Sequence, residues 1–303
     1  MALLLGVLGS PRPNGNSAAL LREAFRGAAE VEGVETEQVR LYDYEFGPCT
    51  ACGKCVRSEE HVCTLPDDMG LDGEGELFTI LRSVNAMLVA NPTYCWGVAA
   101  KVHLFMERIY PFVWSGELMG MPFASISVAT NQGMQRQAES ELCRWACAKG
   151  WRHIGSLPVH RAVWQEMLPK ARELGKRLAE AALADEREGR KKLSESERFL
   201  FYLDKPWDGL EQYLDNLTDG LGDWEHSLIK RALDARSYES EKANEYLRIA
   251  GEELRKALER YREGDREGAS IHLAHCSSYW TRATWGGGEG EPPSVYKPLP
   301  ESR

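Results

Sequence analysis

Residues 2–17 read ALLLGVLGSPRPNGNS, in which an apolar run passes directly into a polar turn. The run Ala2–Gly9 has the length and composition of a buried strand, and Ser17–Val31 after the turn carries apolar residues at helical spacing. A buried strand followed by a short turn and an amphipathic helix is typical of the first unit of a parallel sheet. This stretch therefore predicts that the chain begins an α/β fold.

The same alternation of short apolar runs and longer amphipathic runs continues to about residue 185. The expected strands are Ala2–Gly9, Thr36–Leu41, Ala86–Ala90, Pro122–Thr130 and His153–Pro158. The expected helices are Ser17–Val31, Leu77–Ser83, Val98–Tyr110, Gln135–Lys149 and Val163–Leu183. Strands that alternate with helices predict a doubly wound, five-stranded parallel sheet over residues 1–185.

The pattern changes after the charged run Asp185–Lys192 (DEREGRKK), where we place a domain boundary. Tyr238–Tyr261 and His272–Trp280 have the periodicity of a helical hairpin, and Asp208–Leu233 predicts one or two further helices. Residues 186–285 are therefore expected to form an all-α extension. The Gly- and Pro-rich residues 286–303 are expected to be a flexible tail.

Composition limits the possible locations and partners. The 303 residues carry a formal net charge of -9, which argues against a general nucleic-acid binder. No apolar run approaches the ~20 residues of a membrane span, and the first residues lack the basic segment of a signal peptide. We expect a cytoplasmic protein, in which clustered cysteines are reduced and serve as metal ligands or catalytic groups rather than disulfides.

The turn Gly9–Ser17 (GSPRPNGNS) is a candidate phosphate site. Free backbone N–H groups and the helix dipole at a helix N-terminus favour a phosphate dianion. Ser10, Asn16 and Ser17 could donate hydrogen bonds, and Arg12 could supply charge. The alternative is an ordinary strand-to-helix turn capped by Asn16 or Ser17.

Four of the eight cysteines lie close together, at Cys49, Cys52, Cys55 and Cys63, with the spacing C-x2-C-x2-C-x7-C. Zinc sites usually have two separated pairs of ligands, whereas three closely spaced cysteines and a distant fourth suit a cubane iron–sulfur cluster. Zinc and free or redox-active thiols are the alternatives. Of the other cysteines, Cys143 and Cys147 are expected to pack as small apolar residues, and Cys95 is not expected to be catalytic.

Three segments resemble those of flavodoxin-like, NAD(P)H-dependent FMN reductases. GSPRPNGNS resembles the family's phosphate loop, and Asn91–Gly97 (NPTYCWG) resembles the loop that wraps the isoalloxazine ring. Thr130–Met134 (TNQGM) takes the place of a third, glycine-richer loop, and Phe105–Arg108 (FMER) is similar to a family F-I-D-R motif that usually follows a lysine, here His103. The resemblance covers residues 1–185 and implies FMN bound by Ser10, Arg12, Asn14, Asn16, Ser17, Pro92, Thr93, Tyr94, Trp96, Gly97, Thr130, Asn131 and Gly133.

The cysteine segment, residues 48–69, resembles that of iron–sulfur flavoproteins, a branch of the same family. Pro66–Met69 (PDDM), which ends the segment, is similar to the DDM that follows the cysteine motif in these relatives. The resemblance implies a 4Fe–4S cluster beside the FMN, held by the four cysteines.

These features lead us to expect an FMN-dependent oxidoreductase that passes electrons between NAD(P)H or a ferredoxin and a small-molecule or protein acceptor. The cofactors supply this chemistry, so no acid–base residue is expected to be catalytic. The resemblance also implies a homo-oligomer. One alternative is a cluster-free NAD(P)H-dependent quinone, nitro or azo reductase. Another is a flavin-based redox sensor or interaction protein that acts through its C-terminal helices.

Overall fold

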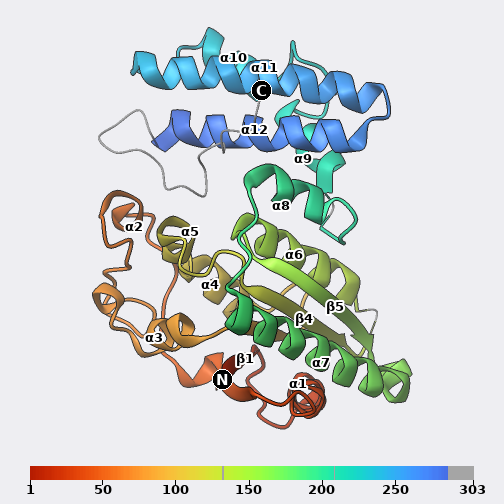
Figure 1. Cartoon of the computed structure of the whole chain (residues 1–303). Coiled ribbons are helices and arrows are strands. Elements are labelled where there is room, and N and C mark those ends of the chain that lie inside the picture. The colour runs from red at the N-terminus through yellow and green to blue at the C-terminus, as the bar shows by residue number, and fades with distance from the viewer. Residues whose placement is uncertain (132, 208, 286–303) are drawn as a thin grey trace. The chain divides into compact units, whose positions relative to one another are not determined.

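The computed structural model describes residues 1–131, 133–207 and 209–285 (Figure 1). The chain divides into two compact units, Met1–Lys192 and a second that begins at Leu193. The predicted tail, residues 286–303, lies outside the described residues. Among the described helices, none combines the length and apolar composition required to cross a bilayer.

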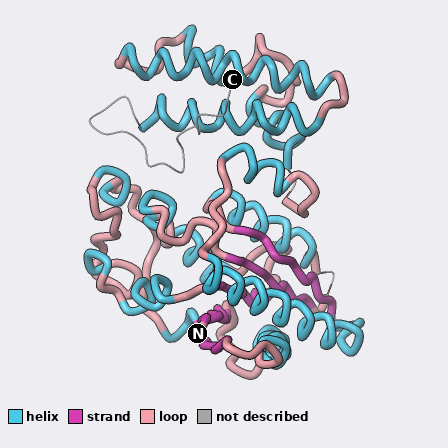
Figure 2. Tube along the Cα trace, viewed as in Figure 1, coloured by secondary structure: helices cyan, strands magenta, loops and turns pink. Residues whose placement is uncertain are grey.

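A five-stranded parallel sheet forms the centre of the first unit (magenta in Figure 2). Its strands are β1 (Ala2–Leu8), β2 (Val34–Arg40), β3 (Ala86–Pro92), β4 (Pro122–Ala129) and β5 (Arg152–His160). They lie in the order β2-β1-β3-β4-β5, which is the order of flavodoxin-like sheets. The predicted α/β fold is confirmed, and the point where the strand order reverses lies between β1 and β3.

Helices α1 (Asn16–Ala28) and α7 (Trp164–Glu188) pack on one face of this sheet. They cross closely at two glycines, because a Cβ atom on Gly27 would overlap the backbone oxygen of Arg172 and one on Gly175 would overlap that of Ala24. α6 (Gln135–Ala148) packs against β4 and β5. Strands β1, β3 and β4 are buried on both sides, as their continuous apolar runs require, whereas β2 at the edge of the sheet is mostly exposed.

The remaining helices of the first unit connect β2 to β4. The segment after β2 contains short helices η1 (Leu41–Asp43), α2 (Lys54–Arg57) and η2 (Leu71–Gly73), and then α3 (Glu76–Ser83). α4 (Ala100–Arg108) and α5 (Pro111–Ser115) follow β3, and η3 (Arg161–Val163) precedes α7. The predicted helix Val98–Tyr110 is thus shorter, and a separate helix with Pro111 at its first position follows it.

α7 extends five residues beyond its expected end at Leu183, as far as Glu188, into the charged run. Its last turns are held by an ion pair of 2.6 Å between Asp185 and Arg152 of β5. The helix ends at Gly189, whose φ of +88° breaks the helical conformation. The run DEREGRKK is therefore partly helical.

The second unit is all-α, as predicted. It contains α8 (Glu195–Tyr202), α9 (Gly209–Leu217), α10 (Leu228–Asp234), α11 (Glu241–Arg262) and α12 (Arg266–Trp285). The predicted hairpin is α11 and α12, which lie antiparallel (Figure 1). α8 was not predicted, although a capping box of Ser194 and Glu197 marks its start.

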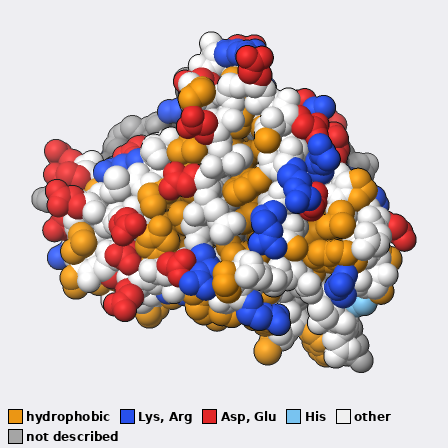
Figure 3. Space-filling model, turned by 90° about the horizontal axis from the view of Figure 1, so that it is seen from below, with side chains coloured by type: hydrophobic (Ala, Val, Ile, Leu, Met, Phe, Trp, Pro, Cys, Tyr) orange, Lys and Arg blue, Asp and Glu red, His pale blue; other side chains and the backbone are white. Residues whose placement is uncertain are grey.

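The surface carries charges of both signs. On the face drawn in Figure 3, acidic side chains gather mainly on the left half, and basic side chains lie mainly across the centre and right. This face therefore carries no continuous basic surface over the residues that the structure describes.

Candidate functional site

Three loops follow the neighbouring strands β1, β3 and β4 and therefore meet at one edge of the sheet. We call them the phosphate turn (Gly9–Ser17), the flavin loop (Asn91–Gly97) and the third loop (Thr130–Met134). The Gly9 N–H donates to the carbonyl of Ala90 (3.0 Å), and the Thr93 N–H donates to the carbonyl of Val128 (2.9 Å). The backbone thus ties the three strand ends together.

The phosphate turn leaves the start of α1 uncapped. Gly15 is the N-cap residue, no side chain caps the helix, and its first turn has no acidic residue. Neither Asn16 nor Ser17 therefore acts as the cap, so the first N–H groups remain available to an anion. A surface hollow beside them is lined by Arg12, Pro13, Asn14, Gly15 and Asn16.

Two hydroxyls of the phosphate turn are buried. Ser10 is 2% exposed and accepts a hydrogen bond of 3.2 Å from the Arg12 N–H, and Ser17 is also 2% exposed. The hydroxyl of Ser10 therefore shapes the turn from within. Arg12 is exposed, as a side chain that contacts a charged ligand at the surface would be.

The flavin loop contains a tight turn with two exposed aromatic side chains. Tyr94 and Gly97 exchange backbone hydrogen bonds of 3.2 and 3.0 Å, and Cys95 and Trp96 between them have φ values of 48° and 67°. Such left-handed conformations are unfavourable for these residue types and concentrate at ligand sites. Tyr94 is 41% exposed and Trp96 is 63% exposed, so both rings are accessible to a planar ligand.

Asn91 fixes the base of the flavin loop. This fully buried residue accepts a hydrogen bond of 2.9 Å from the Ala99 N–H and donates one of 3.1 Å to the Ser127 hydroxyl. Ser127 and Ser125, on the same face of β4, also hydrogen-bond the carboxyl group of Glu139 on α6. Burial raises the pKa of Glu139 to about 7, although the two hydroxyls oppose this.

A buried polar atom beside these residues is available to a ligand. The Thr93 hydroxyl is buried, and among the residues that the structure describes it has no hydrogen-bond partner. Buried polar atoms are almost always paired. The site thus offers a free hydroxyl, an uncapped helix start for an anion and two exposed rings for a planar group. These features suit a cofactor such as FMN.

The third loop lies next to β5. The carbonyl of Asn131 is 2.7 Å from the His160 ring, and Gly133 has a φ of +78°. Met134 follows with a φ of 56° and is 47% exposed. Thr130 is also exposed, so this loop presents a flexible apolar side chain and polar groups at the same sheet edge.

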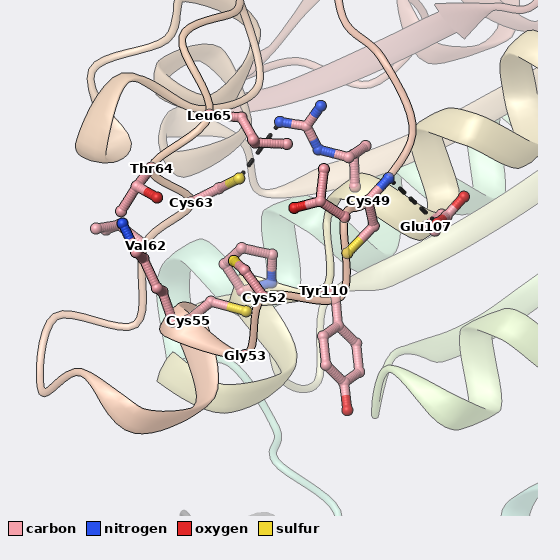
Figure 4. A pocket seen from close by; sticks show the side chains of 14 residues that line it. Cys49, Cys52, Gly53, Cys55, Val62, Cys63, Thr64, Leu65, Glu107 and Tyr110 are labelled. Carbon is pink, nitrogen blue, oxygen red and sulfur yellow. Dashed lines mark hydrogen bonds between the residues drawn. The ribbon is translucent and has the colours of Figure 1, made fainter.

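The cysteine loop, residues 48–69, forms a second site. Cys49, Cys52, Cys55 and Cys63 line one pocket together with Leu65, Glu107, Arg108 and Tyr110, and in Figure 4 the four sulfur atoms face a common space. The structure therefore brings together all four cysteines that the spacing singled out. Cys143 and Cys147, by contrast, are buried, as predicted.

The spacing of the four sulfur atoms bears on the choice of metal. Within the described parts of the chain, the one group of three possible ligand atoms that all lie within 4.8 Å of one another is elsewhere, at Glu253, His272 and His275. No three of the four sulfurs are therefore that close. A single tetrahedral zinc ion with Zn–S bonds of ~2.3 Å would hold its sulfurs about 3.8 Å apart. In a cubane cluster each cysteine bonds a different iron, so the four sulfurs need not lie as close together as around one zinc ion.

The pocket also affects the titration of its thiols. Burial raises the pKa of Cys55 to about 11, and the neighbouring Cys49, Cys63 and Cys52 act in the same direction. The Lys54 backbone N–H lowers the pKa of Cys52. A metal centre bound by these four cysteines would replace their protons.

Comparison with known proteins identifies the family of the first unit. Residues 2–156 match the model of the NADPH-dependent FMN reductase family. The chain belongs to this family. The predicted resemblance to FMN reductases is confirmed for these residues.

The chain is also similar to two proteins named as iron–sulfur flavoproteins. The chain is 37% identical to "Iron-sulfur flavoprotein MJ1083" of Methanocaldococcus jannaschii over 36% of this chain and 52% of that protein. It is 30% identical to an iron–sulfur flavoprotein of Archaeoglobus fulgidus over 58% of this chain and 79% of that protein. The first alignment thus spans about half the length of the relative. A solved "flavone reductase" has 19% identity and a TM-score of 0.48, covering 64% of this chain and 67% of that one.

The sequence interpretation assigned no role to Arg108, which anchors the cysteine loop of this FMN reductase family member. Its buried guanidinium donates to both carboxylate oxygens of Asp67 (2.7 and 2.8 Å), to the carbonyl of Gly47 (2.8 Å) and to the sulfur of Cys63 (3.3 Å). Burial alone would raise the pKa of Asp67, but Arg108 lowers it, so the carboxylate is charged. This contact joins Pro66–Met69 to Phe105–Arg108, the two segments that are similar to family motifs.

Glu107 provides a second anchor, because its carboxylate accepts a hydrogen bond of 3.2 Å from the Cys49 N–H. Lys101, two turns earlier on α4, donates to the Tyr44 carbonyl (3.1 Å) and lies 3.7 Å from the centre of the Phe46 ring. α4 thus begins next to the flavin loop, contacts the segment before the cysteine loop through Lys101, and contacts the cysteine loop itself through Glu107 and Arg108.

Proposed function

We propose that the chain is a flavin-dependent oxidoreductase that binds FMN at the three loops and a 4Fe–4S cluster at Cys49, Cys52, Cys55 and Cys63. The observation that carries this proposal is the position of α4. Its first residues follow the flavin loop, and its last two, Glu107 and Arg108, contact the cysteine loop. A nine-residue helix spans about 13 Å, so one rigid element would hold both cofactor sites at a fixed separation.

The FMN phosphate would lie against the free N–H groups at the start of α1, with Arg12 neutralising its charge. Ser10, Asn14, Asn16 and Ser17 would complete this phosphate site. The isoalloxazine ring would lie at the flavin and third loops, where it would contact Pro92, Thr93, Tyr94, Trp96, Gly97, Thr130, Asn131 and Gly133. Bound FMN supplies hydride and single-electron chemistry, whereas these residues bind and orient it.

The cluster proposal is supported by the four cysteines that line one pocket and by the names of the relatives. Such a cluster transfers single electrons, so it would connect the flavin to a one-electron partner. We propose that electrons pass between NAD(P)H or a ferredoxin-like protein and a small-molecule or protein acceptor. Residues 1–185 would form this redox domain and residues 186–285 a helical extension, in a cytoplasmic homo-oligomer.

Anaerobic purification followed by flavin, iron and sulfide analysis tests both cofactors. We expect about one FMN and about four irons per chain. Cys63→Ala should lose the iron and keep the flavin. Cys147→Ala is the matched control, because this thiol is 4% exposed and lies outside the pocket, and it should keep both.

The possible results separate the candidate functions. Flavin without iron in the unmodified chain would refute the cluster and favour a cluster-free quinone, nitro or azo reductase. Material that contains no flavin and does not bind added FMN would refute the whole assignment. With both cofactors present, anaerobic mixing with NADPH and with reduced ferredoxin identifies the donor that bleaches the flavin.

A further inference from the structure

Glu253, His272 and His275 lie together in the second unit, which the family match at residues 2–156 does not reach. Glu253 is on α11, and the two histidines lie three residues apart on the facing helix α12. One carboxylate oxygen of Glu253, Oε2, is 2.7 Å from Nδ1 of His272 and 3.3 Å from Nδ1 of His275. Three potential metal ligands thus meet at one point of the hairpin, all within 4.8 Å of one another.

Neighbouring side chains contact Glu253 Oε1 and His275 Nε2, whereas Glu253 Oε2 and the Nδ1 atoms of the two histidines face one another. Lys256 forms a 2.7 Å ion pair with the other oxygen of Glu253, Oε1, so Oε2 remains for the imidazoles. The outer nitrogen of His275, Nε2, is 3.1 Å from the hydroxyl of Ser196 on α8. A ligating histidine usually has such a partner for its outer N–H, because that contact fixes the tautomer and the ring orientation.

The cluster is sheltered but accessible. The side chains of His272, His275 and Glu253 are 25%, 21% and 11% exposed. An ion bound by these side chains would therefore be shielded from solvent on the protein side, and a water molecule could still reach it from the solvent side. Two histidines and one carboxylate with an open position form a ligand set that proteins use for Zn²⁺, in which the fourth ligand is water.

We propose that Glu253, His272 and His275 bind one divalent ion of the Zn²⁺ class. Without the ion, the two imidazoles share Glu253 Oε2 through Nδ1–H groups. With the ion, each neutral imidazole carries its hydrogen on Nε2, and His275 donates it to Ser196, so both Nδ1 lone pairs and Oε2 face the metal. Bound metal would connect α8, α11 and α12 of the second unit. This site is independent of the proposed flavin and cluster chemistry.

Zinc binding to the full-length chain tests the proposal. After treatment with a chelator, the unmodified chain and the variants His272→Ala and Glu253→Gln are dialysed against Zn²⁺, and bound zinc is counted. The cysteine loop is unchanged in all three proteins, so any zinc that it binds contributes equally to each count. We expect each variant to bind one zinc per chain fewer than the unmodified protein.

The matched control is His226→Ala, because His226 also pairs with a carboxylate, Asp223 (2.9 Å), but has no second histidine in the pair. It should bind as much zinc as the unmodified chain. Ser196→Ala keeps all three ligands and should weaken zinc binding about 10-fold. Co²⁺ bound at this site should give the weak visible bands of nitrogen and oxygen ligation rather than intense thiolate bands. Equal zinc contents in the unmodified chain, His272→Ala and Glu253→Gln, each folded by circular dichroism, would overturn the proposal.

Discussion

Replacing Glu139 by glutamine should change how the stability of the first unit depends on pH. The Glu139 carboxyl is buried on α6, with 2% of its surface exposed, and hydrogen-bonds the hydroxyls of Ser125 and Ser127. Burial raises its pKa from 4.5 to about 7. Between pH 4.5 and about 7, the folded state therefore keeps a proton on Glu139 that the unfolded chain has lost.

The sign and size follow from proton linkage. Below pH 4.5 both states are protonated, and the group imposes no pH-dependent cost. As the pH rises towards about 7, the unfolded state alone ionises, so the free energy of unfolding falls. At about 1.4 kcal/mol per pKa unit, the loss over this interval amounts to about 3 kcal/mol. Glutamine has nearly the same shape and no charge, so the variant should lack this loss.

Denaturant unfolding of the full chain at pH values from 5 to 8, followed by circular dichroism, measures the effect. The difference in unfolding free energy between Glu139→Gln and the unmodified chain should shift in favour of the variant by about 2–3 kcal/mol across this range. Glu173→Gln, at an exposed position of α7, is the control and should give a profile parallel to that of the unmodified chain. Parallel profiles for Glu139→Gln would refute the argument that burial holds this proton.

Three further substitutions test the packing and the cofactor sites. Arg12→Ala should weaken FMN binding about 10-fold and leave riboflavin binding unchanged, because riboflavin lacks the phosphate; equal losses measured by fluorescence titration would argue against a phosphate site. Gly27→Ala should lower the free energy of unfolding by about 1–3 kcal/mol in denaturant titrations, because the new methyl group would overlap the backbone of α7; an unchanged midpoint would contradict that crossing. Arg108→Lys retains the charge but not the paired contacts to Asp67, so purified protein should contain less iron per flavin; an unchanged ratio would show that the charge alone suffices.

The strands and long helices could be predicted because their local pattern agrees with their burial. β1, β3 and β4 are buried along almost their whole length, and their apolar runs are unmistakable in the sequence. α8 was missed because it follows the charged run directly and begins with glutamates that resemble a solvated linker. Three of its first four residues are nevertheless buried. Tertiary packing here overrides the composition of the segment.

The candidate site was predictable where its residues are adjacent in sequence and not where distant residues meet. The spacing of the four cysteines identified the second site, but the contact between Arg108 and Asp67 joins residues 41 positions apart. Glu139 was missed for a related reason. A glutamate in a helix as polar as α6 is expected to face solvent. Glu139 is buried instead, and the hydroxyls of Ser125 and Ser127 on β4 provide the hydrogen bonds that its carboxyl group needs there.

The contacts at both ends of α4 explain why these missed residues matter to the proposed function. Asn91 holds the residue before the helix, Ala99, and is itself held by Ser127, which also contacts Glu139. Arg108 holds the other end to the cysteine loop. Because buried polar contacts fix both termini, the helix cannot shift along its axis without leaving buried groups unpaired, which costs about 1–3 kcal/mol for each group. A mobile connection would let the distance between two redox centres vary, whereas a helix held at both ends keeps that distance constant. The buried polar residues of the first unit would therefore set the spacing of the two proposed cofactor sites, although none of them needs to contact a cofactor.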